Sequence, residues 1–193
     1  GAPPVALLWP PQAEFFRSTP SPFEVSTRRM VLSMPTSAGK TLMAQAIVIH
    51  AIEATDRDAC IVAPTHALCR EIAADLNTRL DVVGKRAVDA SFGSLDTSGA
   101  RVVVTTPERL GAALRADPLA VIERFGIVAV DEAHLIAEAG RGQQLEHSLS
   151  LLHDLTKDVP DFRLLLISAA LGDGAQLSTW IRAGEPPAQV SIK

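Results

Sequence analysis

Short apolar runs alternate along this chain with longer segments in which apolar residues recur every three or four positions. The short runs are rich in β-branched residues and end at polar or small residues, which is typical of buried strands. Strands are predicted at 30–34, 59–63, 101–105, 127–130 and 163–167, with a weaker one at 82–90 and a short one at 190–192. Helices are predicted at 42–52, 67–80, 107–116, 118–125, 143–155 and 176–181, and another is predicted to begin at Pro11.

Strands that alternate with helices and have uniformly apolar cores predict a three-layer α/β domain: a mainly parallel sheet with helices on both faces. Ligands of such sheets bind beyond the carboxyl ends of the strands. The polar residues that follow the predicted strands fall at that edge, at 36–41, 64–65, 105–106, 131–134 and Ser168. One edge of the molecule is therefore expected to carry the chemistry.

The first candidate site is Gly39-Lys40-Thr41, between the strand at 30–34 and the helix that follows. Such a turn aims backbone N–H groups, a helix N-terminus and a lysine at one point, which suits a polyphosphate. Lys40 is expected to reach the β and γ phosphates, and the Thr41 hydroxyl to hold Mg²⁺. The usual pattern begins with Gly where this chain has Met34, and alone the three residues fit a solvated turn equally well.

The second candidate site is the acidic pair Asp131-Glu132, which follows the apolar strand at 127–130. Successive side chains of a strand point to opposite faces, so the two carboxylates are expected to have different tasks. Asp131 is placed to bind Mg²⁺ beside Thr41, and Glu132 to polarise a water molecule for attack on the γ-phosphate. Alone the pair fits a solvated turn, but in combination with Lys40 it predicts a site for a nucleoside triphosphate and Mg²⁺.

Composition limits the remaining possibilities. The formal net charge is −4, so no broad basic field attracts nucleic acid, and any such contact must come from local hydroxyls, amides and a few arginines. Cys60 and Cys69 fall in apolar segments and are interpreted as reduced packing residues of a cytoplasmic protein. No apolar run approaches ~20 residues, so no membrane segment is expected. Arg28-Arg29 is expected to be solvated, and the histidines show no zinc-like spacing.

Taken in order, the polar segments resemble those of the first RecA-like domain of superfamily-2 helicases, and within them the Ski-type group of the DExH class. Residues 131–134 read Asp-Glu-Ala-His, and 141–146 match the Arg-Gly-x-x-Leu-Glu signature of that group. Residues 35–41 match the family's Pro-Thr-x-Ala-Gly-Lys-Thr. The sequence departs from the family at Ala170, where a threonine links the acidic motif to the nucleic-acid site. The other matching segments are 10–13, 63–65, 105–108 and 168–170.

The resemblance implies that ATP and Mg²⁺ are cofactors and that single-stranded or partly duplex DNA or RNA is the partner. It assigns the contact with the adenine base to Gln12, although residue chemistry alone favours Gln12 as an ordinary residue on a helix surface. It makes Lys40, Asp131, Glu132 and His134 catalytic, with His134 sensing the loss of the γ-phosphate. The remaining assignments are phosphate contacts by Thr36, Ser37, Ala38, Gly39, Lys40 and Thr41, nucleic-acid contacts by Pro64, Thr65, Thr105, Thr106 and Glu108, and coupling by Ser168, Ala169, Ala170 and Arg141.

The resemblance also implies that residues 1–193 form one RecA-like domain and that a second such domain of the parent chain is missing. Alone, the domain is then expected to bind ATP weakly and to hydrolyse it poorly. Two alternatives stay open: a phosphate-loop kinase or GTPase, and a nucleotide-gated scaffold with impaired motor activity. A GTPase is expected to carry Asn-Lys-x-Asp, which this sequence lacks, whereas Ala170 makes the scaffold conceivable.

Overall fold

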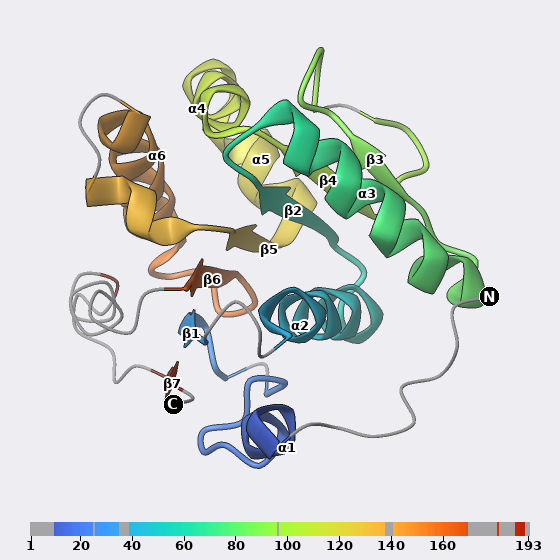
Figure 1. The fold of residues 1–193 in the computed structure, drawn as a ribbon. Helices are drawn as coiled ribbons and strands as arrows, with labels where there is room; N and C mark the ends of the chain where they lie inside the picture. The colour runs from blue at the N-terminus through green and yellow to red at the C-terminus, as the bar shows by residue number, and fades with distance from the viewer. Residues whose placement is uncertain are drawn as a thin grey trace.

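A seven-stranded sheet forms the centre of this computed structural model, which describes residues 10–24, 26–34, 39–95, 97–137, 141–169, 181 and 188–191 (Figure 1). All six pairings between these strands are parallel, and their order is β3-β4-β2-β5-β6-β1-β7. The predicted α/β fold is therefore confirmed. The strands are β1 Arg29–Ser33, β2 Asp58–Val62, β3 Ala87–Asp89, β4 Val102–Thr105, β5 Phe125–Val130, β6 Arg163–Ser168 and β7 Ala188–Ser191.

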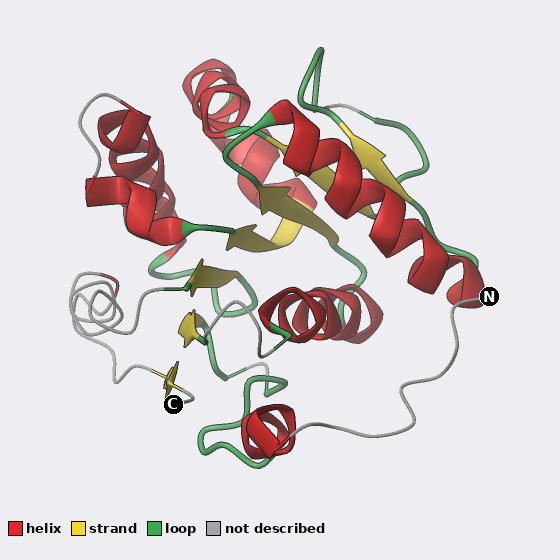
Figure 2. Cartoon of the chain, viewed as in Figure 1, coloured by secondary structure: helices red, strands yellow, loops and turns green. Residues whose placement is uncertain are grey.

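Helices cover both faces of the sheet, as the red and yellow elements of Figure 2 show. One apolar cluster joins one face of the sheet to α2 and α3 and includes Phe15 of α1, and a second joins the opposite face to α4, α5 and α6. The helices are α1 Pro10–Phe16, α2 Lys40–Ala54, α3 His66–Leu80, α4 Pro107–Ala116, α5 Pro118–Arg124 and α6 Arg141–Thr156, with 3-10 helices η2 Asp81–Val83 and η3 Ala133–Ala137.

Local sequence explains where several helices begin. Thr65 is extended and its Oγ1 accepts a hydrogen bond from the Leu68 N–H at 3.2 Å, which caps α3. Pro107 and Pro118 occupy the first turns of α4 and α5, where a missing N–H leaves no helical bond unmade. The predicted starts of both helices are confirmed.

Alternation along β5 decides where the acidic pair points. Ile127 and Ala129 belong to the cluster under α2 and α3, whereas Val128 and Val130 belong to the cluster under α4, α5 and α6. Because successive side chains alternate, Asp131 comes next on the α2 side. The register of one apolar strand therefore directs a carboxylate toward the start of α2.

The structure corrects three local predictions. Residues 82–90 form η2 and the three-residue strand β3 instead of one strand, and Gly84 in the left-handed conformation (φ 65°) separates the two. The helix predicted at 143–155 begins two positions earlier, since α6 starts at Arg141. The last strand, β7, begins at Ala188, two positions before the predicted 190–192. The helix predicted at 176–181 lies outside the described residues, except for Ile181.

The arginine pair at the start of β1 is also not solvated as predicted. Arg29 is 4% exposed, and its Nη2 donates to Thr156 Oγ1 at 2.6 Å. Arg28 Nη2 donates to the carbonyl oxygens of Thr156 and Lys157 at 2.8 and 2.7 Å. Both arginines thus tie β1 to the carboxyl end of α6, where unpaired carbonyl groups and the helix dipole favour a cation.

Both cysteines are free thiols buried in the core. Burial raises the pKa of Cys60 to about 12 and that of Cys69 to about 11, so both thiols stay protonated and unreactive at neutral pH. Among the helices of the described segments, none combines the length and apolar character needed to cross a bilayer.

Replacing Thr156 with Val tests the buried arginine contact. Thr156 is fully buried, and valine keeps its shape but leaves Arg29 without its hydroxyl acceptor. We expect the free energy of unfolding, measured by urea denaturation, to fall by about 1–3 kcal/mol. Thr78→Val removes an exposed hydroxyl that donates to Asp75 O, and should change stability by less than ~0.5 kcal/mol. Equal effects of the two substitutions would contradict the assignment.

Candidate functional site

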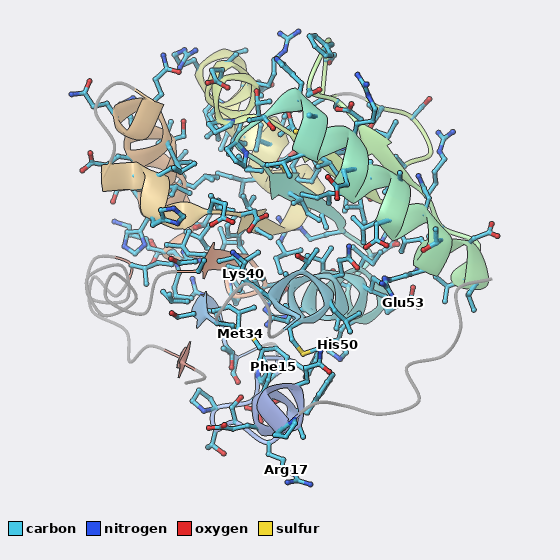
Figure 3. The ribbon with its side chains drawn as sticks, in the orientation of Figure 1. Phe15, Arg17, Met34, Lys40, His50 and Glu53 are labelled. Atoms are coloured by element: carbon cyan, nitrogen blue, oxygen red, sulfur yellow. The ribbon has the colours of Figure 1, made fainter. Side chains whose placement is uncertain are left out.

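The structure brings the two sequence motifs together. Lys40, the first residue of α2, donates from Nζ to Glu132 Oε1 at 3.1 Å, and the same nitrogen lies 3.8 Å from Asp131 Oδ1. The Lys40 side chain is only 5% exposed. Figure 3 shows Lys40 at the start of α2, beside the central strands. A buried ammonium group thus meets two carboxylates at the carboxyl edge of the sheet.

Asp131 lies in a partly desolvated position. Burial raises the pKa of its carboxyl group, an effect that Lys40 opposes and that the neighbouring Glu132 carboxylate reinforces. An added cation beside this carboxylate would favour its ionised form. Asp131 and Thr41 both border one small cavity under α2, so the residue that carries the carboxylate and the residue that carries the hydroxyl are neighbours. Oxygen ligands are those that Mg²⁺ takes in proteins, so these residues fit the metal.

Glu132 is held in an unusual backbone conformation. Its φ is 52°, a left-handed value that costs most residues other than glycine free energy, and its N–H donates to Asp131 Oδ1 at 3.0 Å. His134 Nδ1 lies 3.3 Å from Glu132 Oε2, yet neither atom has a hydrogen-bond partner among the described residues, and both are buried. Buried polar atoms without partners are rare, and a bound water or ligand atom would satisfy them.

Gln12 lies against the start of the same helix. Gly39, the residue before α2, has φ 80°, and a Cβ at this position would overlap the Gln12 amide nitrogen. Gln12 is 8% exposed, so the residue predicted to contact adenine lies beside Gly39, which directly precedes α2. Figure 3 shows Phe15, which like Gln12 belongs to α1, close beneath α2. The predicted phosphate contacts Thr36, Ser37 and Ala38 lie outside the described residues.

A second cluster of candidate residues surrounds a cavity of about 310 Å³ at the same edge. Four of the five predicted nucleic-acid residues line it, namely Pro64, Thr65, Thr106 and Glu108. The side chain of the fifth, Thr105, is fully buried and its hydroxyl donates to Ala90 O at 3.1 Å, so it supports the end of β4 instead of lining the cavity. Sequence reasoning missed the other lining residues, which are His66, Ser91, Phe92 and Arg109.

The predicted coupling residues divide between described and undescribed parts of the chain. Ser168 ends β6, the strand between β1 and β5, and its carbonyl accepts from Met34 N at 3.3 Å. The 3-10 helix η3, which carries His134, packs beside β6. Ala169 follows in a half-buried bend. Ala170 and the side chain of Arg141 lie outside what the structure describes.

The first turn of α6 packs unusually closely against η3. Gly142 is buried there, and a Cβ at this position would overlap the carbonyl oxygens of Leu135 and Ile136. Only a residue without a side chain lets the two backbones approach this far. The glycine of the 141–146 signature thus fixes the helical segment that carries His134.

Residues 9–177 match the family described as DEAD/DEAH box helicase. The chain belongs to the DEAD/DEAH box helicase family. The DEAD/DEAH relatives include the ATP-dependent DNA helicase Hel308 of Thermoplasma acidophilum, which is 31% identical over 161 residues that cover 81% of this chain and 23% of that protein. The ATP-dependent DNA helicase MER3 of Saccharomyces cerevisiae is 30% identical over 195 residues, covering 93% of this chain and 15% of that protein.

A solved structure shows the same fold. The crystal structure of the DUF1998 helicase MrfA superposes with a TM-score of 0.72, covers 98% of this chain and 31% of that one, and is 21% identical. The RecA-like architecture of a DEAD/DEAH box helicase domain is therefore shown. The chain spans 23% and 15% of the length of the two curated relatives above.

Gly142→Ala tests the close packing of α6 on η3. In an open helix the change would add up to about 1 kcal/mol of stability, but here we expect a loss of about 1–3 kcal/mol because the methyl group overlaps backbone. Gly111→Ala in α4 is the matched control, since its Cβ would meet only the movable side-chain ends of Ser148 and Arg115 at 3.0 and 3.2 Å. Urea denaturation measures both, and a Gly142→Ala chain as stable as the parent would contradict this packing.

Proposed function

We propose that this chain is the ATP-binding domain of a nucleic-acid-dependent ATPase that couples hydrolysis to translocation along, or unwinding of, DNA or RNA. The observation that carries the proposal is the meeting of Lys40 with Asp131 and Glu132 at one edge of a parallel sheet. Family membership supports it, and two relatives named as DNA helicases favour DNA as the first substrate to test.

The ion pair suggests how the site changes when ATP binds. Lys40 is neutralised by Glu132 and Asp131. Phosphate oxygens would compete for the same ammonium, so binding would release the Glu132 carboxylate. Once released, Glu132 accepts a proton from, and orients, the attacking water, while Gln12 pairs with the adenine edge. Mg²⁺, held by Thr41 and Asp131, would neutralise the charge of the β and γ phosphates.

Response to the γ-phosphate is assigned to His134 and the end of β6. His134 lies beside Glu132, and η3 places it next to the strand that ends in Ser168. Loss of the γ-phosphate would therefore change the contacts of His134. That change would in turn alter the position of Ser168 and of the following Ala169 and Ala170. Arg141, in the signature that closes α6 onto η3, supports assignment to the Ski-type group.

A second RecA-like domain in the parent protein belongs to the same proposal. Relatives several times longer than this chain leave room for it. Such a domain would supply arginines to the γ-phosphate, each typically worth about 10³–10⁵ in rate. The 193 residues alone would then bind ATP weakly and hydrolyse it poorly. Ala170, in place of a hydroxyl residue, favours a nucleotide-gated scaffold as the second candidate function.

Lys40→Ala tests nucleotide binding by the chain itself. Because a charge-assisted contact with phosphate contributes about 1.5–3 kcal/mol, we expect the dissociation constant for ATP in Mg²⁺ to rise at least about tenfold. Titration calorimetry measures it. Lys85→Ala is the control, since Lys85 pairs with Glu53 away from the site and its loss should leave ATP binding unchanged. If the Lys40→Ala chain and the unsubstituted chain bind ATP with equal affinity, Lys40 is not part of the ATP site.

Glu132→Gln separates binding from hydrolysis in the parent protein. Loss of the carboxylate base should lower ATP turnover by about 10²–10⁴ while ATP binding is kept, because glutamine has nearly the same shape. Glu123→Gln, an exposed change on α5, should leave turnover unaltered. Turnover of the parent with and without single-stranded DNA or RNA distinguishes a motor, which nucleic acid stimulates, from a scaffold, which it does not.

A further inference from the structure

We propose that Phe92 and His66 form a stacking platform for one nucleobase of a single strand that crosses the 310 Å³ cavity. The inference rests on the proposed function and adds a contact to a base, where the sequence motifs supply only contacts to the sugar-phosphate backbone. It concerns a loop, 90–95, to which the sequence assigned no task.

The two rings already form a stack. Their centroids are 4.0 Å apart and their planes differ by 14°. Phe92 is nevertheless 67% exposed, so His66 covers one face of the phenyl ring and most of the remaining surface is in contact with water. An exposed aromatic ring held parallel to a second ring offers a flat apolar face of the kind on which bases stack.

The platform adjoins groups that suit a phosphate backbone. Two helices begin at the cavity, the 15-residue α3 after Thr65 and the 10-residue α4 after Thr106, and the N-termini of helices attract anions. Arg109 adds a guanidinium group to the lining. Among the lining residues that the structure describes, Glu108 is the one carboxylate. It can accept hydrogen bonds from a sugar hydroxyl or a base amine but repels a phosphate placed directly beside it.

A buried hydroxyl in the same lining points independently to a ligand. Ser91 is 1% exposed, and its Oγ has no hydrogen-bond partner within the described segments. A buried hydroxyl without a partner is unfavourable, and a sugar or phosphate oxygen in the cavity would satisfy it. Ser91 precedes Phe92 directly, so the same short loop presents a hydroxyl and an aromatic face to one occupant.

The loop that carries the platform is anchored to the sheet. Ala90 N donates to Val104 O at 2.8 Å, Thr105 Oγ1 donates to Ala90 O at 3.1 Å, and Ser91 N donates to Asp89 Oδ1 at 2.9 Å. These bonds fix the loop where it leaves β3, so little ordering is needed when a base binds. The buried Thr105 thus positions the platform without contacting the bound nucleic-acid strand.

The test measures binding of two fluorescently labelled probes by anisotropy at low salt, where phosphate contacts are strongest. One probe is a thymidine oligonucleotide, and the other is an abasic oligonucleotide of the same length that keeps only sugars and phosphates. The variants are Phe92→Ala, Phe92→Trp and the control Leu119→Ala, which removes an apolar side chain of similar exposure (63%) on α5.

Phe92→Ala should weaken binding of the thymidine probe by about fivefold to about 150-fold, and binding of the abasic probe by less than about twofold. Phe92→Trp should bind at least as well as the parent, and Leu119→Ala should equal it. If the unsubstituted protein binds both probes but Phe92→Ala weakens binding of neither probe, or of both equally, the stacking proposal is contradicted while the proposed function stands. If the unsubstituted protein binds neither probe, the proposed function is contradicted, and the stacking platform with it.

Discussion

The structure depends on one buried electrostatic contact, between the Lys40 ammonium and the carboxylates that follow β5. A lysine that is 5% exposed is stable as a cation only beside opposite charge, because an isolated buried charge loses its hydration without compensation. The parallel sheet provides that charge. It ends β1, β6 and β5 at one edge, so the helix after β1 starts next to the turn after β5.

The same arrangement explains why a bound polyphosphate would change more than its own contacts. Glu132 is bonded to Lys40 on one side and lies 3.3 Å from His134 Nδ1 on the other, in a backbone conformation that few residues adopt freely. Any ligand that attracts Lys40 alters the partners of Glu132. Because η3 packs on β6 and Gly142 holds α6 close to η3, the altered contact lies within a tightly packed region. A further polar link joins α2 to α3, where Gln45 donates to Asp75 and accepts from Arg79 at 2.7 and 2.8 Å.

Sequence was sufficient for what depends on local pattern, and insufficient for what depends on distant partners. Apolar runs and prolines at first helical turns located most strands and helices because periodicity and caps are local. Arg29 was misjudged because its acceptor, Thr156, lies on a helix far along the chain. The stack of Phe92 on His66 was missed for the same reason, although an aromatic residue in a polar loop was a visible signal. Thr105 matched a motif, yet the fold buries it.

A crystal structure of this chain with Mg²⁺ and a non-hydrolysable ATP analogue tests the central claim most directly. The account predicts that the β and γ phosphates lie on Lys40, that Mg²⁺ lies between Thr41 and Asp131, and that Lys40 has left Glu132. A nucleotide bound elsewhere, with Lys40 Nζ still 3.1 Å from Glu132 Oε1, would contradict it.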